Sequence, residues 1–131
     1  MHIIIGGAYN GKREYVRTIL AGREAEWREI GHSYNSDAIQ TIVISGIEQW
    51  LAETNLSEAE AIDYVLAAVA GRDVIVVLTD IGRGIVPIDA QQRKLRDTCG
   101  RLYQRLMAEA DEVTRIWYGV AQTLKKRGEV I

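Results

Sequence analysis

The chain has 131 residues, of which 47% are hydrophobic and 26% are charged. This balance is typical of one soluble globular domain with an adequate core, so we expect a single domain over residues 1–131 and no second domain. The formal net charge of −2 argues against a general binder of nucleic acid or of a membrane surface, because such proteins concentrate basic residues on one face. The basic run from Lys125 to Arg127 is a short tail segment that does not alter this expectation.

The sequence also indicates the location of the protein and the chemistry open to its cysteine. Its first residues lack a basic leader with a long apolar core, and no apolar run approaches the roughly 20 residues that span a bilayer. The expected location is therefore the cytoplasm. Cys99 is the only cysteine, which excludes an internal disulfide and a cysteine-based zinc site, and its expected role is that of a small core residue.

The first predicted elements are a strand from His2 to Ile5 and a helix from Arg13 to Leu20, joined by a glycine-rich stretch. That stretch satisfies Gly-x-x-x-x-Gly-Lys between a strand and a helix, the context that a phosphate-binding loop requires. Glycines let backbone N–H groups approach phosphate oxygens, while the helix N-terminus and the lysine supply positive charge. The alternative is a purely structural turn. The predicted nucleotide-binding residues are Gly6, Gly7, Ala8, Tyr9, Asn10, Gly11, Lys12 and Arg13.

This motif lacks one of its usual parts. The Ser or Thr that normally follows the lysine and holds Mg²⁺ is Arg13 here. An arginine at a helix start can pair with a phosphate directly, or it can point to solvent and pair with a nearby acid such as Glu14. The sequence leaves both alternatives open.

Further apolar runs predict three more strands. Thr41 to Ser45 and Asp73 to Thr79 are near-continuous apolar runs, which suit strands covered on both faces, and Val113 to Tyr118 is a weaker fourth strand. Strands that alternate with longer helical patterns are typical of an α/β fold built on a parallel sheet. We therefore predict the α/β class.

Two helices are predicted in the second half of the chain. Ser57 and Glu60 form a capping box ahead of an apolar stripe, and Gly71 ends that helix. The longest helix runs roughly from Asp89 to Glu109 and carries an apolar face of Leu95, Cys99, Leu102 and Leu106. On its polar face, Asp97 has arginines four residues away on both sides, Arg93 and Arg101, and can pair with either. Gly100 inside this helix predicts a close backbone contact with another element.

A second glycine-containing loop follows the Asp73 to Thr79 strand. It stands at the carboxyl edge of a parallel sheet, where ligands gather in open α/β folds. On position alone, a ligand-contacting loop and an ordinary strand-to-helix connection are equally supported. The candidate substrate-loop residues are Asp80, Gly82, Arg83, Gly84 and Pro87.

Several segments together carry a family resemblance. They are Ile5 to Lys12, the loop Gly82-x-Gly84-Ile85-Val86-Pro87, and the helix Arg96-Asp97-x-x-Gly100-Arg101-x-x-Gln104-Arg105-Leu106 followed by Ala110-Asp111-Glu112-Val113. These segments resemble the adenosylcobinamide kinase / adenosylcobinamide-phosphate guanylyltransferase family of cobalamin biosynthesis. Ile42 to Leu51 is similar to that family's second core strand and following helix, and Trp27 to Ile30 is similar to its Trp-Arg element. The resemblance covers most of the chain.

The resemblance implies a P-loop, RecA-like, mostly parallel sheet flanked by helices in a single three-layer domain that assembles as a trimer. Members of the family transfer a phosphoryl group from ATP or GTP to the aminopropanol hydroxyl of the corrinoid cobinamide, and then attach GMP through a guanylylated histidine. By this resemblance Lys12 is a catalytic residue that holds the β- and γ-phosphates, and Asp80 is an assisting acid. The implied partners are a nucleotide, a corrinoid and further copies of the chain.

The chain departs from the family at the residues of the chemistry. Arg13 replaces the magnesium-binding Ser or Thr, and Ser45 stands where the family's second core strand ends in Asp or Glu, so Mg²⁺ binding requires Ser45 or Asp80 to take over. No histidine lies between Leu20 and Trp27, so the family's nucleophile has no counterpart there, and His32 is expected to be an exposed loop residue. Guanylyl transfer is therefore expected to be lost.

Three functions stay open on the sequence. The chain is a shortened corrinoid kinase that keeps phosphoryl transfer, or a catalytically degraded relative that binds a nucleotide or phosphate for sensing or partner binding, or a pathway scaffold that binds no nucleotide. Dependence of nucleotide binding and turnover on magnesium separates the first two.

Overall fold

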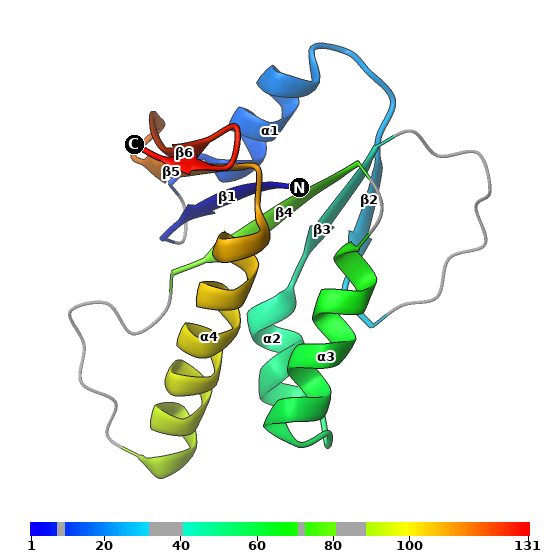
Figure 1. Ribbon diagram of the computed structural model, residues 1–131, viewed down its shortest axis with the longest axis vertical. Helices are drawn as coiled ribbons and strands as arrows, with labels where there is room; N and C mark the ends of the chain where they lie inside the picture. The colour runs from blue at the N-terminus through cyan, green and yellow to red at the C-terminus, as the bar shows by residue number, and fades with distance from the viewer. Residues whose placement is uncertain (8–9, 32–40, 71–72, 81–88) are drawn as a thin grey trace.

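The computed structural model describes residues 1–7, 10–31, 41–70, 73–80 and 89–131. These ranges form seven strands and four helices (Figure 1). The strands are β1 (His2–Gly6), β2 (Glu26–Glu29), β3 (Ile42–Ser45), β4 (Val74–Thr79), β5 (Glu112–Trp117), β6 (Val120–Lys126) and β7 (Glu129–Val130). The helices are α1 (Lys12–Leu20), α2 (Ile47–Glu53), α3 (Glu58–Val69) and α4 (Ala90–Glu109).

All seven strands belong to one sheet with the order β2-β3-β4-β1-β5-β6-β7. The first five in this order are parallel, whereas β6 and β7 add antiparallel pairs at one edge. Parallel strands end at the same edge of a sheet, so Gly6, Ser45, Thr79 and Trp117 close four strands at a common carboxyl edge. The neighbouring strands β1 and β4 lead in opposite directions, because the chain continues from β1 through α1 to β2 and from β4 through α4 to β5. Ligands bind at such a switch point in open α/β sheets.

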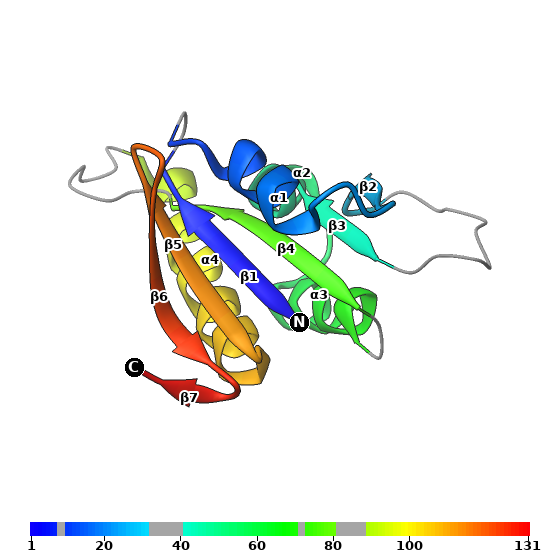
Figure 2. The same cartoon turned by 90° about the horizontal axis from the view of Figure 1, so that it is seen from above.

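The sheet is the middle of three layers. The helix α1 covers one face, and α2, α3 and α4 cover the other (Figures 1 and 2). Successive residues of β1 show this arrangement, because Ile3 belongs to the core cluster with Leu102 and Leu106 of α4, whereas Ile4 packs with Val16 of α1. Both isoleucines are 0% exposed, so the strand is buried on both faces. The predicted α/β class and three-layer arrangement are confirmed.

The predicted helix signals are mostly confirmed. The Ser57 side chain accepts a bond from the amide of Glu60 and the Glu60 side chain accepts one from the amide of Ser57, which completes the capping box of α3. Asp89 caps α4 by accepting from the Gln92 amide at 2.7 Å. Cys99 is buried in the core, as expected. The predicted helix end at Gly71 lies outside the described residues.

The prediction for Gly100 of α4 is wrong, and Arg101, one of the two arginines considered for Asp97, has another partner. A methyl group added at Gly100 would meet no atom of the described chain within 4 Å, so no close contact requires that glycine. Arg101 does not pair with Asp97, because it donates to the Glu58 carboxylate across the contact between α3 and α4, where Thr98 also donates at 2.7 Å. Asp97 contacts the neighbouring Arg96 at 3.4 Å.

The basic run at residues 125–127 is not a tail. Lys125 lies in β6, and its ammonium donates to the carbonyl oxygens of Met107 and Ala108 at 2.9 and 3.0 Å, which caps the C-terminal turn of α4. Arg127 and Gly128 form the turn into β7, with φ angles of 54° and 79°. Within the described part of the chain, none of the helices has both the length and the apolar composition for a membrane span.

A candidate phosphate-binding site at the carboxyl edge of the sheet

The glycine turn lies at the exit of the central strand. β1 ends at Gly6 and α1 begins at Lys12, both at the carboxyl edge of the sheet. The described residues there, 6–7 and 10–12, are here called the glycine turn. Gly11 precedes the helix with φ 88°, a left-handed conformation that glycine adopts without a steric penalty. Among the described residues, no side chain caps the first turn of α1, so its backbone N–H groups and the positive end of the helix dipole favour an anion.

The Lys12 ammonium folds back over the start of this turn. Its Nζ donates to the carbonyl oxygens of Gly6 at 3.0 Å and Gly7 at 2.6 Å. An ammonium group has three N–H donors, so these two bonds leave one for an incoming phosphate oxygen. Burial lowers the pKa of Lys12, and the negative charges of Glu48 and Asp80 act in the opposite direction.

Neighbouring strands hold the glycine turn on both sides. The carbonyl of Gly6 accepts from the amide of Asp80, which directly follows β4, at 2.9 Å. On the other side, the carbonyl of Asn10 accepts from the amide of Gly119 in the turn between β5 and β6, at 2.8 Å. A methyl group added at Gly6 would lie 2.4 Å from the carbonyl oxygen of Ile116, so only glycine fits against β5 at this point.

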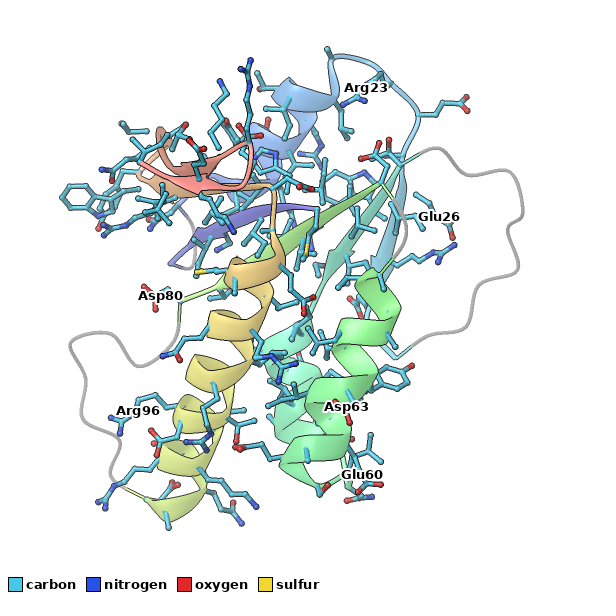
Figure 3. The ribbon with its side chains drawn as sticks, in the orientation of Figure 1. Arg23, Glu26, Glu60, Asp63, Asp80 and Arg96 are labelled. Carbon is cyan, nitrogen blue, oxygen red and sulfur yellow. The ribbon has the colours of Figure 1, made fainter. Side chains whose placement is uncertain are left out.

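A cavity of about 710 Å³ opens beside the glycine turn. This volume lies within the ordinary range of about 300–1,000 Å³ for small-molecule sites. Asp80 supplies negative charge from the end of β4 (Figure 3), and Arg115 supplies positive charge from β5. The polar and aromatic lining residues are Gly6, Gly7, Asn10, Asp80, Arg115 and Trp117.

Glu48 is a second carboxylate at this edge, and sequence reasoning missed it. It lies in the first turn of α2, which begins directly after Gly46, a residue with φ 76° at the exit of β3. Its Oε2 atom is buried and has no hydrogen-bond partner in the described structure. The sequence feature that could have indicated it is an acidic residue three positions after Ser45, the last residue of β3. This residue lies inside α2 and not at the end of the strand.

The negative charge of Glu48 contributes to the raised pKa of two residues on the core face of α4, as well as acting to raise that of Lys12. Burial, with a smaller contribution from Glu48, raises the pKa of Cys99 to about 11. Burial is also the largest cause of the raised pKa of Tyr103, again with a contribution from Glu48. The Tyr103 hydroxyl donates to the carbonyl of Thr79 at 2.9 Å and so braces the end of β4 ahead of Asp80.

Arg13 contacts an aromatic ring and not Glu14. Its guanidinium carbon lies 5.9 Å from the centroid of the Trp27 ring on β2, within the range of a cation–π contact. Glu14 pairs with Arg17, which also contacts the Trp27 ring at 5.8 Å. The arginine at this position is therefore directed toward Trp27 on β2.

The structure brings together only part of the predicted site. Gly6, Gly7, Lys12 and Asp80 meet at the carboxyl edge, and Ser45 closes β3 at the same edge with its carbonyl bound by the amide of Ile30. Asn10 and Gly11 also lie in the glycine turn, and Arg13 lies against the Trp27 ring. The other predicted residues lie outside the described residues, as does His32; they are Ala8, Tyr9, Gly82, Arg83, Gly84 and Pro87.

Comparison with known proteins gives a family match. The model of the family described as cobinamide kinase / cobinamide phosphate guanyltransferase matches residues 21–124. The chain belongs to this family. The bifunctional adenosylcobalamin biosynthesis protein of Salmonella typhimurium strain LT2 is 42% identical over 52 residues, which cover 40% of this chain and 29% of that protein. A solved protein from Pyrococcus horikoshii OT3 aligns with a TM-score of 0.39 and 9% identity over 100% of this chain and 78% of its own.

Membership of the cobinamide kinase / guanyltransferase family confirms the resemblance seen in the sequence and implies a role in cobalamin biosynthesis. The mostly parallel sheet is consistent with the P-loop-like fold of the family. The match begins at residue 21, so the glycine turn lies outside the matched residues. The aligned stretch spans less than a third of the length of the Salmonella protein.

The residues at this edge fit the Mg²⁺ ion that phosphoryl transfer in this family implies. Among the described residues, no group of three or more His, Cys, Asp or Glu side chains is arranged to hold a metal. Mg²⁺, however, is commonly retained by one or two carboxylates together with substrate phosphates and water. Glu48, whose Oε2 atom has no partner among the described residues, and Asp80 both act to raise the pKa of Lys12. Two suitable carboxylates therefore lie near the glycine turn.

Proposed function

We propose that the chain binds ATP or GTP through the glycine turn and transfers the terminal phosphoryl group to the aminopropanol hydroxyl of cobinamide. The observation that carries this proposal is the position of Lys12, whose ammonium is anchored over the turn by Gly6 and Gly7 with one donor left. Family membership supplies the substrate class. The left-handed Gly11 and the uncapped first turn of α1 support an anion at the same place.

The proposed chemistry assigns a role to each group at the edge, and it assigns two to Asp80. Backbone amides of the glycine turn and Lys12 hold the phosphates and stabilise the charge that develops during transfer. The cobinamide hydroxyl attacks the γ-phosphorus, the bond to the β,γ-bridging oxygen breaks, and ADP or GDP leaves. Asp80 accepts the hydroxyl proton. When bound, Mg²⁺ supplies neutralisation of the phosphate charge, and Glu48 and Asp80 are the carboxylates that would hold it.

The proposal does not include guanylyl transfer. That step uses a nucleophilic histidine in the family, and the interval between Leu20 and Trp27 contains none. His2 lies at the opposite, amino-terminal end of β1, where its Nε2 contacts Thr114 at 2.8 Å and its Nδ1 contacts Glu112 at 3.3 Å. The proposed activity is therefore phosphoryl transfer alone.

A second candidate is a nucleotide-binding protein without turnover. The replacement of both customary metal anchors, by Arg13 and by Ser45, favours it, because loss of metal contacts impairs transfer more than binding. In this case the chain acts in the pathway as a nucleotide sensor or as a partner of another enzyme. Saturable binding that is insensitive to magnesium, without any phosphorylated product, distinguishes it from the kinase.

Titration calorimetry tests the shared part of both candidates. ATP and GTP are titrated with and without Mg²⁺ into the natural protein, into Lys12→Ala, and into Lys126→Ala as a control for an exposed lysine. We expect Lys12→Ala to weaken binding at least about tenfold, because it removes a charge-assisted contact to phosphate, and Lys126→Ala to leave it unchanged. Absence of binding at millimolar nucleotide overturns both candidates.

A coupled assay then tests transfer. Adenosylcobinamide is incubated with the protein, nucleotide and Mg²⁺, and the corrinoid product is analysed by mass. A phosphorylated corrinoid that depends on Lys12 supports the kinase. Its absence, alongside an active pathway enzyme as a positive control, leaves nucleotide binding as the function.

A further inference from the structure

Glu48 presents an oxygen atom that the fold itself does not satisfy. Oε2 is buried, and no hydrogen-bond donor of the described residues contacts it. Buried polar atoms are almost always partnered, since leaving one without a partner carries the full penalty of its desolvation. An atom of this kind on a functional edge therefore indicates a ligand or ion that completes its surroundings.

The topology explains why this carboxylate reaches the glycine turn. The strand β3 is separated from β1 only by β4, and both neighbours end at the same edge. Gly46 adopts a left-handed conformation immediately after β3 and starts α2 at once, so Glu48 stays in the first turn of the helix. Glu48 raises the pKa of Lys12 more than Asp80 does, so both carboxylates lie near this lysine.

We propose that Glu48 is the acid of the phosphate site: together with Asp80 it receives the divalent cation that accompanies the nucleotide, in place of the strand-end acid that Ser45 does not provide. This inference rests on the proposed binding of a nucleotide to the glycine turn. It moves the acidic ligand from the end of β3 into the first turn of α2, three residues further along the chain.

The chemistry of the ion fits two carboxylates and an incoming phosphate. Mg²⁺ takes hard oxygen ligands and completes its shell with water and substrate oxygens, so it needs no closed protein cage. Without the nucleotide, the charge of Lys12 interacts with both Glu48 and Asp80, which raise the pKa of Lys12. The site should therefore take up a divalent cation strongly only when phosphate oxygens are present to share it.

Mn²⁺ is the probe for this test, because it replaces Mg²⁺ at oxygen sites and its binding is followed directly by electron paramagnetic resonance. ATP affinity is measured by calorimetry, with and without Mn²⁺, for the natural protein and for Glu48→Gln. The glutamine keeps the shape of the side chain and removes its charge. We expect binding of metal-free ATP to remain within about twofold, and the ATP-dependent affinity for Mn²⁺ to fall at least about tenfold.

Two further variants sharpen the comparison. Glu53→Gln makes the same substitution at an exposed position of α2 and should leave both affinities unchanged. Ser45→Asp added to Glu48→Gln returns an acid to the end of β3 and should recover most of the Mn²⁺ affinity, which a structural role of Glu48 would not predict.

The outcomes are distinguishable from failure of the proposed function. If the natural protein binds no ATP under any condition, the proposed function fails and the inference fails with it. If ATP binds and Glu48→Gln keeps the full Mn²⁺ effect, nucleotide binding stands and the inference is overturned. Loss of metal-free ATP binding in Glu48→Gln likewise overturns it, since the residue would then serve the fold.

A measurement on the natural protein covers the case in which Glu48→Gln does not fold. With ATP present, Mn²⁺ should broaden the backbone amide signals of Gly46, Glu48 and Asp80 in a nitrogen-15 spectrum. Signals that stay sharp at these residues while others broaden overturn the inference.

Discussion

The amide of Gly119 donates to the carbonyl oxygen of Asn10 at 2.8 Å and so joins the turn between β5 and β6 to the glycine turn. A methyl group added at Gly11 would lie 3.4 Å from the Cα atom of Gly119, so the two turns are also in close van der Waals contact. The C-terminal hairpin thus contributes directly to the shape of the candidate phosphate site.

The first prediction uses two glycines in matching turns. Gly119 and Gly128 both have φ 79° and no atom within 4 Å of an added methyl group, so alanine should cost about 1–2 kcal/mol at either position through the left-handed conformation. Only Gly119→Ala should also weaken nucleotide binding, because only Gly119 holds the glycine turn. Urea unfolding and calorimetry measure the two effects, and equal nucleotide affinities would contradict the supporting role of the hairpin.

The second prediction concerns Gly6, which has no room for a side chain. Gly6→Ala should lower the free energy of unfolding by about 3 kcal/mol or more, because the obstructing atom is a backbone oxygen of β5 and not a movable side chain. Gly100→Ala is the matched control, since an added methyl group there meets nothing and alanine favours a helix by about 1 kcal/mol. Similar unfolding midpoints for the two variants would count against the close packing of β1 on β5.

The sequence predicted the part of the fold that is buried on both faces. The runs at Thr41 to Ser45 and Asp73 to Thr79 are mostly apolar because helices cover both faces of these strands. Such apolar runs can be recognised from the sequence alone. The strand β2 gave no such signal, since Glu26 and Arg28 pair with each other at an edge of the sheet. The hairpin of β6 and β7 was missed for the same reason, because its residues are largely exposed.

The candidate site was predictable where spacing defines it. The glycines and Lys12 follow a fixed pattern along the chain, and the structure brings Lys12 to the start of the turn. Glu48 could not be found in this way, because its proximity to Lys12 arises from the order of β3, β4 and β1 in the sheet. The partner of Arg13 was likewise unpredictable, since Trp27 approaches only when β2 pairs beside β3.

The third prediction tests the role of Arg13. Because its guanidinium lies over Trp27, Arg13→Ala should lower stability by only about 0.5–1 kcal/mol and leave ATP affinity within about twofold. Arg17→Ala removes a similar contact to the same ring and is the matched control. The readouts are Trp fluorescence during unfolding and calorimetric affinity. A large loss of affinity confined to Arg13→Ala would show instead that this arginine pairs with a phosphate.

The fourth prediction concerns the pH dependence of stability. Burial lowers the pKa of His2 below its ordinary value of 6.5, while Glu112 acts to raise it and the N-terminal ammonium to lower it. The unfolded chain therefore binds a proton at higher pH than the folded protein does. The stabilising contribution of neutral His2 is fully present above about pH 6.5 and is lost progressively as the pH falls toward the folded pKa.

Comparison with His2→Gln isolates this contribution, because the variant does not titrate at that position. Urea unfolding is measured from pH 8 to pH 5 for both proteins. The free energy of unfolding of the natural protein should decline more steeply below about pH 6.5. Parallel curves for the two proteins would mean that His2 does not control the decline.

The central claim is that the glycine turn is an anion site anchored by Lys12. Its most direct test is a crystal structure with a non-hydrolysable GTP analogue and Mg²⁺. We expect the β-phosphate to lie against the backbone amides at the start of α1, with the Lys12 ammonium in contact with a phosphate oxygen. A triphosphate bound elsewhere on the molecule, with Lys12 still bonded only to Gly6 and Gly7, would contradict it.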